Sequence, residues 1–585
     1  MDKTQVQKID LSRKRYANLA DKYYNEGNFV SALRLAYREL KEFGGDADVY
    51  TRFSDIYEAM SLQGSAINFW FKFLDIATEE DLPDIYEGLA ANFLAIGNEN
   101  QSAYYYNKLI DVDDTLSDDI KLDIAEAFST SKKDKFRFVY PPRLADYSKE
   151  VSAGTRALKA GDATRAILEF DKVEQGSKEF IAAKEMQAVA FLLAGDSESA
   201  EGVCLEALAE NPDDVRVLST LAAVYMEQGR REESKQLALL LSQKELTNPD
   251  DMYKVATVCC ENDMHQEAYE RFKKMDSKMP YDGRMLYFKG VAAFKSGYIK
   301  EAEQTFDELC SIYPDAEVAK YYLRQIRDYI EVLENGVEMP PPQLTYFYHL
   351  PQEERDARCN ALMKVNNCTG TEAQLFGLLV LRDGYLHWCF DEMDGGDHDL
   401  QYLALVTANH VRADEFIQDV LLDFEVADVL KIETLRMLLE RNEDLEVGIV
   451  LCNIHQKLTL NRIKIGRKRR KRFIEGYAKL ASKFIVIRST YNKRIADCAE
   501  LLYQALEKQN ALELVKSADD CACAIYFLTG FKELGQDVQR VAAAFEADFT
   551  KVQAMLACVL DSREGQEEDN AIESVESEEN TDEMD

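Results

Sequence analysis

The sequence predicts an all-α protein assembled from stacked helix pairs, and three observations lead to this fold class. Small residues return every 34 residues through the first half of the 585-residue chain. The helix-breaking residues Pro and Gly number only 11 and 27, which favours long helices. In the second half, apolar residues recur at three- and four-residue spacing, as they do in amphipathic helices.

The 34-residue spacing is clearest between residues 144 and 335. Small side chains hold two corresponding positions in five successive units. The first position is held by Gly154, Ala188, Ala222, Ala256 and Gly290. The second lies twelve residues later and is held by Ala166, Ala200, Ser234, Ala268 and Ala302. Two antiparallel helices cross closely only where side chains are small, so each unit is predicted to be a helix pair. Gly between the two helices, as at Gly161 and Gly195, allows a turn with positive φ.

The same register continues upstream. Small residues predict about three further helix pairs over residues 1–130, at Ala20 with Ala32, Ser54 with Ala66, and Ala91 with Ala103. Residues 131–143 are basic and aromatic and contain a Pro pair, which breaks helices and predicts a connecting loop. We therefore expect two stacks, 1–130 and 144–335, the second closed by a capping helix over 318–333.

A 34-residue unit with small residues at both crossing positions, Gly in the turn and an aromatic residue such as Phe170 or Phe306 near its end resembles the tetratricopeptide repeat. The resemblance covers residues 13–335. It implies a superhelix whose concave face, lined by the first helix of each pair, holds a peptide. Chaperone-binding members grip a carboxylate with Lys and Asn at positions held here by Ala17 and Asp21, so a chaperone-tail adaptor is disfavoured.

The positions that the resemblance assigns to the concave face differ between the two stacks. In the first stack they are largely acidic: Asp21, Tyr24, Asp55 and Glu58. In the second they are apolar or aromatic: Leu192, Met226, Tyr253, Tyr287 and Phe294. We expect a basic segment to bind the first face by charge and an apolar or helical peptide to bind the second. In the alternative interpretation, the acids are solvated and the aromatic residues pack between repeats.

The C-terminal half follows a Pro-rich linker over residues 336–343. Residues 344–560 are predicted to form a helical domain with one small β-hairpin, from the strand-like runs 446–454 and 457–465. Residues 378–390 fit either a second hairpin or two short helices. The tail over 561–585 is acidic and lacks aromatic residues, so it cannot bury a core and is expected to be disordered.

One basic segment interrupts this acidic chain, whose formal net charge is −36. Eight of the eleven residues 462–472 are Lys or Arg: Arg462, Lys464, Arg467, Lys468, Arg469, Arg470, Lys471 and Arg472. Such density suits phosphate groups, so nucleic-acid or phosphate binding is one expectation. Docking onto acidic parts of the same chain, such as the tail, or of a partner is the other. The overall charge argues against general binding to nucleic acid or anionic membranes.

The sequence contains no recognisable catalytic or metal-binding motif. One segment collects potential ligands, His387, Cys389, Asp391, Asp394, Asp397, His398 and Asp399, but their spacing fits neither a zinc ribbon nor an EF-hand. No run of 18 apolar residues and no apolar signal core occurs.

The sequence therefore predicts a cytoplasmic, non-enzymatic scaffold that binds a protein or peptide partner, with no membrane contact and no cofactor. The alternative is a nucleic-acid- or phosphate-binding regulator acting through residues 462–472. A third, less favoured alternative is a hydrolase within residues 344–560.

Overall fold

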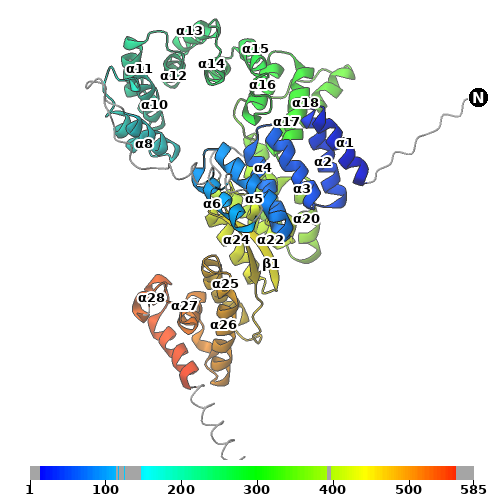
Figure 1. The fold of residues 1–585 in the computed structure, drawn as a ribbon, viewed down its shortest axis with the longest axis vertical. Helices are drawn as coiled ribbons and strands as arrows, with labels where there is room; N and C mark the ends of the chain where they lie inside the picture. The colour runs from blue at the N-terminus through cyan, green and yellow to red at the C-terminus, as the bar shows by residue number, and fades with distance from the viewer. Residues whose placement is uncertain are drawn as a thin grey trace, which may run out of the picture. The chain divides into compact units, whose positions relative to one another are not determined.

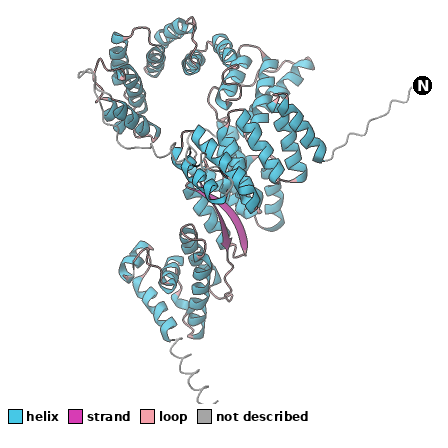
Figure 2. Cartoon of the chain, viewed as in Figure 1, coloured by secondary structure: helices cyan, strands magenta, loops and turns pink. Residues whose placement is uncertain are grey.

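The computed structural model describes residues 13–113, 116, 121, 124, 147–391, 397–535 and 537–561. Helices dominate these residues, which contain one two-stranded sheet (Figure 2). The chain divides into two compact units: residues 1–121, 353–390 and 394–585 form the first, and residues 122–352 and 391–393 form the second. The predicted loop over 131–143 and all of the predicted tail except Asp561 lie outside the described residues.

The first unit begins with three helix pairs (Figure 1). Their helices are α1 (Arg13–Asn25), α2 (Phe29–Phe43), α3 (Ala47–Ala59), α4 (Gln63–Ile76), α5 (Leu82–Ala95) and α6 (Glu99–Val112). The crossing residues Ala20 and Ala32 are completely buried, as close helix packing requires. Gly27 adopts φ 74° in the turn between α1 and α2, and the Asn28 side chain caps α2 by accepting a hydrogen bond from the Ser31 amide.

The first unit continues after the second has been completed. Its helices are α19 (Gln352–Asn367), α20 (Gly370–Arg382), α21 (Tyr385–Asp391), α22 (His398–Val411), α23 (Asp414–Leu422), α24 (Asp428–Glu440), α25 (Arg470–Phe484), α26 (Tyr491–Lys508), α27 (Ala518–Thr529) and α28 (Val538–Ala544), with a further helical run over 549–561. Residues 378–390 are thus helical, and the alternative of a second hairpin there is wrong.

The predicted hairpin is formed by β1 (Leu445–Leu451) and β2 (Ile454–Leu460), which pair antiparallel with Leu445 opposite Leu460. The two turn residues Cys452 and Asn453 both have positive φ, 49° and 61°. A turn of this kind matches the twist of the strands it joins.

The second helices of the second and third N-terminal pairs, α4 and α6, pack against the C-terminal half of the first unit. Phe71 of α4 and Tyr105 of α6 share a buried apolar cluster with Leu422 and Val450. The Tyr105 hydroxyl donates a hydrogen bond to the Asn453 carbonyl at 2.8 Å. Along α4, Asn68 donates to Asp423 at 3.1 Å, Lys72 pairs with Asp419, and Asp75 lies 3.1 Å from the His455 ring.

In its described residues, the second unit contains five helix pairs followed by the single helix α18. They are α8 (Ser148–Lys159), α9 (Ala163–Phe170), α10 (Phe180–Leu193), α11 (Ser197–Glu210), α12 (Val215–Glu227), α13 (Arg231–Ser242), α14 (Pro249–Glu261), α15 (His265–Met275), α16 (Gly283–Lys295), α17 (Ile299–Ile312) and α18 (Glu317–Glu334). Within this unit the pairs follow one another along an arc (Figure 1).

Candidate peptide-binding site

A hollow of about 220 Å³ lies between the first helices of the first two pairs. Asp21 and Tyr24 reach it from α1, whereas α3 contributes five lining residues, Asp48, Thr51, Arg52, Asp55 and Ile56. The structure therefore brings the predicted residues Asp21, Tyr24 and Asp55 together. The hollow lies on α1 and α3, whereas the C-terminal half of this unit packs against α4 and α6.

Glu58, the fourth predicted residue of this face, has other contacts. Its Oε1 accepts hydrogen bonds from the Trp70 indole at 2.8 Å and the Asn92 amide at 2.6 Å. Glu58 thereby ties α3 to α4 and to α5 of the next pair. It does not line the hollow, although its charge acts on the nearby Asp55.

One cation, Arg52, lines the hollow together with three carboxylates, and it pairs with two acids. Arg52 donates to Asp21 at 2.8 Å and to Glu39 at 3.0 Å. Glu39 is only 2% exposed, and it also pairs with Arg13 at 3.2 Å. Among the described residues, no ion pair involves Asp48 or Asp55, so the wall formed by α3 retains uncompensated negative charge.

The environment of the hollow shifts the titration of Asp55. Its pKa is raised to about 6, first by partial burial and then by the charge of Glu58, while Arg52 opposes the rise. The same surroundings raise the pKa of Tyr24, through burial and the charges of Asp55 and Glu58. A cation that approaches this carboxyl group stabilises its charged form.

The predicted face of the second stack is more heavily packed. Tyr287 is 1% exposed and Phe294 is 8% exposed. The Tyr253 ring lies 6.1 Å from the rings of both Phe272 and Phe288. Leu192 and Met226 are half-buried. The aromatic members of this predicted set therefore pack against neighbouring helices.

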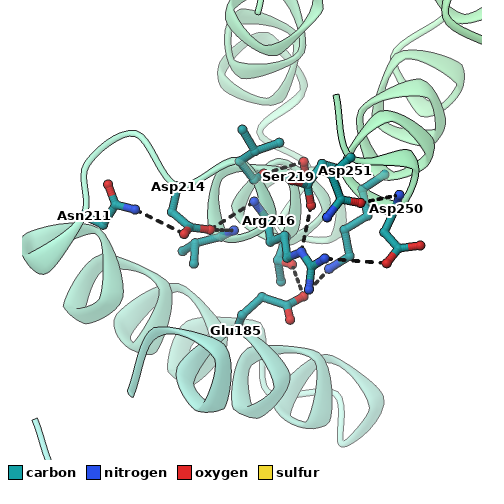
Figure 3. A network of polar contacts seen from close by, with 12 residues as sticks. Glu185, Asn211, Asp214, Arg216, Ser219, Asp250 and Asp251 are labelled. Atoms are coloured by element: carbon teal, nitrogen blue, oxygen red, sulfur yellow. Dashed lines mark hydrogen bonds and ion pairs between the residues drawn. The ribbon is translucent and has the colours of Figure 1, made fainter. Parts of the chain in front are cut away.

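The same stack carries polar residues on its first helices that the sequence analysis missed. In Figure 3, Glu185 of α10 lies beside α12 and α14. Its carboxylate accepts from the Thr220 hydroxyl at 3.1 Å and from Lys254. Arg216 of α12 pairs with Asp251 at 2.8 Å. The signal in the sequence is that the position of Glu185 is held by Tyr253 two repeats later, and the position of Lys254 by Phe288 in the next repeat.

The basic segment lies at the start of α25. Arg462, Lys464, Arg467, Lys468, Arg469, Lys471 and Arg472 are exposed and Arg470 is half-buried. Lys471 pairs with Glu475 at 3.7 Å, and Arg472 donates to the Lys516 carbonyl. No other ion pair of this segment is found within the described residues. Arg469, which precedes the helix, has φ 54° and offers no side-chain cap.

The potential metal ligands between residues 387 and 399 have separate environments. The His387 ring packs edge-on against Phe416 at 5.0 Å. Asp397 caps α22 by accepting hydrogen bonds from two backbone amides, and Asp394 falls outside the described residues. Across the described parts of the chain, no three His, Cys, Asp or Glu side chains are placed to hold one metal ion. The described helices also include none long and apolar enough to cross a membrane.

Two family models match part of this chain, and several solved structures are similar to it. Two family models, both described as tetratricopeptide repeat, match residues 151–215 and 191–253. Similar solved structures include yeast Tom70, with 13% identity and a TM-score of 0.24 over 73% of this chain and 94% of that chain. The TPR domain of P58(IPK) has 13% identity and a TM-score of 0.22 over 69% of this chain and 99% of that chain.

A tetratricopeptide repeat protein from Parabacteroides merdae has 13% identity and a TM-score of 0.21 over 45% of this chain and 92% of that chain. No curated protein matches the sequence. The 34-residue spacing, the helix pairs that it produces and the two family matches together identify residues 151–253 as tetratricopeptide repeats.

Proposed function

We propose that the protein is a non-enzymatic scaffold that holds a basic segment of a partner protein in the hollow of the first stack. The repeats support a general role in protein interaction. The observation that carries the specific proposal is the hollow between α1 and α3, with Asp48 and Asp55 on its wall. A Lys or Arg side chain entering there meets carboxylates that lack an ion-pair partner among the described residues.

Two further features support this assignment. The C-terminal half of the first unit packs against α4 and α6, whereas the hollow lies on α1 and α3. Arg52 pairs with Asp21 and with the buried Glu39, and its charge offsets that of Asp55 only in part, because the pKa of Asp55 is still raised. The charge complementarity that results favours a cationic partner and repels an anionic one.

The experiment measures binding of a fluorescent Lys- and Arg-rich peptide to the full chain by anisotropy at low salt. Asp48→Asn with Asp55→Asn is expected to weaken binding roughly tenfold, because two negative charges are removed from the hollow. Glu79→Gln with Glu80→Gln is the matched control: it removes the same charge from exposed positions of the same stack outside the hollow. Equal weakening by both pairs would show that only the overall charge of the chain matters.

A second candidate function is supported by the exposed basic segment. Residues 462–560 contain 18 Lys and Arg against 11 Asp and Glu, a surplus of seven positive charges in a chain of net charge −36. Positive side chains crowded at the N-terminus of α25 repel one another and the positive end of the helix dipole. A bound phosphate group would relieve that repulsion. We propose nucleic-acid binding through this segment as the alternative.

A salt titration with single-stranded RNA tests the second candidate. Affinity is expected to fall steeply as salt rises, because phosphate contacts release counterions. Replacing Arg467, Lys468, Arg469 and Lys471 with Gln is expected to abolish binding. Replacement of Lys493, Lys508, Lys516 and Lys532 with Gln removes as many charges from the same region and is the control. A loss that is equal in both variants contradicts a site at residues 462–472.

A further inference from the structure

The chain places one of its own segments against the aromatic face of the second stack. Residues 343–350, which we call the groove segment, begin at the last residue of the Pro-rich linker and form neither helix nor strand. They contact Cys260 of α14, Tyr287 of α16 and Tyr322 of α18. Of these, α14 and α16 are the first helices of their pairs, on the side that the family resemblance assigns to bound peptides. All of the contacts described next fall within the second unit.

Buried tyrosines of the stack contact the backbone of the groove segment. The Tyr287 hydroxyl is within hydrogen-bond distance of two carbonyl oxygens of the segment, that of Thr345 at 3.0 Å and that of Phe347 at 3.1 Å. The Tyr322 hydroxyl donates to the His349 carbonyl at 3.0 Å. Contacts with carbonyl oxygens do not depend on the side chains of the segment. Any extended peptide whose backbone followed the same course could therefore make them.

Two alternate side chains of the segment enter the face. The Tyr346 ring stacks on Phe288 with centroids 6.1 Å apart, and its hydroxyl lies 2.9 Å from the His265 ring. Lys295 approaches the Tyr346 ring to 5.6 Å.

Two residues further on, the Tyr348 ring meets Tyr287 edge-on at 4.8 Å, and its hydroxyl donates to Asp391 at 2.9 Å. Phe347 lies between Tyr346 and Tyr348 in the sequence and is 70% exposed. The face therefore holds two aromatic side chains, and the residue between them is exposed to solvent.

We propose that this face is a binding site for an extended segment of a partner protein carrying two aromatic residues with one residue between them, and that the groove segment is its tethered occupant. The segment is attached on its N-terminal side by exposed chain, because residues 333–341 are all exposed. Its release therefore requires no rearrangement of that linker. The site is separate from the hollow of the first stack and takes a different class of partner.

Tethering determines how such a site responds to a partner. The short linker gives the groove segment an effective concentration on the order of millimolar. The apparent dissociation constant of a partner peptide is the intrinsic constant divided by the fraction of open sites. A segment that covers the face about 99% of the time therefore weakens external binding about 100-fold. Variants that release the segment are expected to reveal the intrinsic affinity.

The test uses the full chain and a fluorescent peptide with the sequence of residues 343–350, followed by anisotropy. Tyr346→Ala with Tyr348→Ala is expected to bind the peptide at least tenfold more tightly than the unaltered chain does. Phe347→Ala is the matched control and is expected to leave the affinity unchanged, because Phe347 faces solvent. Adding Tyr287→Phe to the double variant is expected to weaken binding again. A peptide with Ser in place of both tyrosines is expected not to bind.

A second measurement needs no variant and covers the case in which the double variant does not fold. Hydrogen exchange of the unaltered chain is expected to show residues 343–350 exchanging at least 100-fold faster than α16 and α18, because a tethered ligand opens locally. Exchange of the groove segment only together with those helices would overturn the proposal. Equal peptide affinity in the unaltered chain and the folded double variant, or equal binding of the Ser-substituted peptide, would also overturn it.

Discussion

Lys254 of α14 reaches across α12 to the carboxylate of Glu185 on α10, which lies 69 residues earlier in the chain. The interaction thus joins the first helices of two repeats that are not adjacent in the sequence. Thr220 of the intervening α12 donates to the same carboxylate. Glu185 is only 6% exposed, so three successive repeats are held together by one buried acid.

Removal of Lys254 tests this arrangement. Lys254→Met is expected to lower the free energy of unfolding of the second stack by about 1–2 kcal/mol, because Glu185 loses its charged partner in a buried position. Urea denaturation followed by circular dichroism measures the change. Glu185→Gln combined with Lys254→Met is expected to recover part of the loss, since the unpaired charge is gone. A single variant as stable as the unaltered chain contradicts this account.

The raised pKa of Asp55 predicts that binding of a basic peptide depends on pH. As pH falls through about 6, Asp55 takes up a proton and the hollow loses one negative charge. Affinity is expected to fall several-fold between pH 7 and pH 5, measured by anisotropy at constant ionic strength. Asp55→Asn is expected to flatten this profile, whereas Glu79→Gln leaves it intact. A profile unchanged by Asp55→Asn assigns the pH dependence to another group.

A buried lysine predicts a second pH effect, on stability. Lys431 is 1% exposed and donates to the Val450 carbonyl at 2.7 Å, and burial lowers its pKa to about 8. The unfolded chain holds this proton more tightly, because an ordinary lysine has a pKa of about 10.4. Stability of the first unit is therefore expected to rise between pH 8 and pH 10.

Lys431→Met is expected to remove that rise and to stabilise the protein by about 1–3 kcal/mol at pH 7, because no charge has to be buried. Urea denaturation at a series of pH values measures both effects. Lys457→Met replaces an exposed lysine of β2 and is the control. If the rise persists in the Lys431 variant, another group titrates in this range.

The contact between α4 and the hairpin depends on the missing side chain of Gly448. A Cβ atom at this position would lie 1.8 Å from the Asp75 carboxylate. Gly448→Ala is therefore expected to separate β1 from α4 and to destabilise the first unit by about 2–4 kcal/mol, a size typical of overpacking. Thermal unfolding measures the loss.

A second substitution distinguishes this clash from a weakened strand. Combining Gly448→Ala with Asp75→Ala removes the carboxylate that the new methyl group meets, and is expected to recover much of the stability despite the loss of the Asp75–His455 contact. If the double variant is no more stable than Gly448→Ala alone, the clash is not the cause.

The helix pairs could be predicted because their requirements are local. Ala20 and Ala32 are fully buried where their helices cross, and Gly27 has the positive φ that its turn needs. The hairpin was placed correctly, but its strands begin and end earlier than the runs 446–454 and 457–465. The turn falls inside the first run, because Cys452, an apolar residue that resembles a strand residue, adopts positive φ.

The long-range contacts could not be predicted because nothing local specifies them. Asp75 and His455 are 380 residues apart, and each alone looks like an ordinary surface residue. Residues 344–350 read as the start of the C-terminal domain, yet their tyrosines contact the second stack. The repeat register places Asp21, Tyr24 and Asp55 on one face, where they line the hollow. The hydrogen bonds of Glu58 to Trp70 and Asn92 depend instead on side-chain geometry.

The packing of α4 and α6 against the hairpin has a consequence for how the protein is made. The N-terminal repeats leave the ribosome long before β1 and β2, which complete their apolar cluster. Phe71, Phe93 and Tyr105 therefore await a partner while the whole second unit is synthesised and folds, since domains generally fold as they emerge. The nascent first stack is thus expected to need chaperones. A fragment ending near residue 130 is expected to keep this apolar surface exposed and to aggregate.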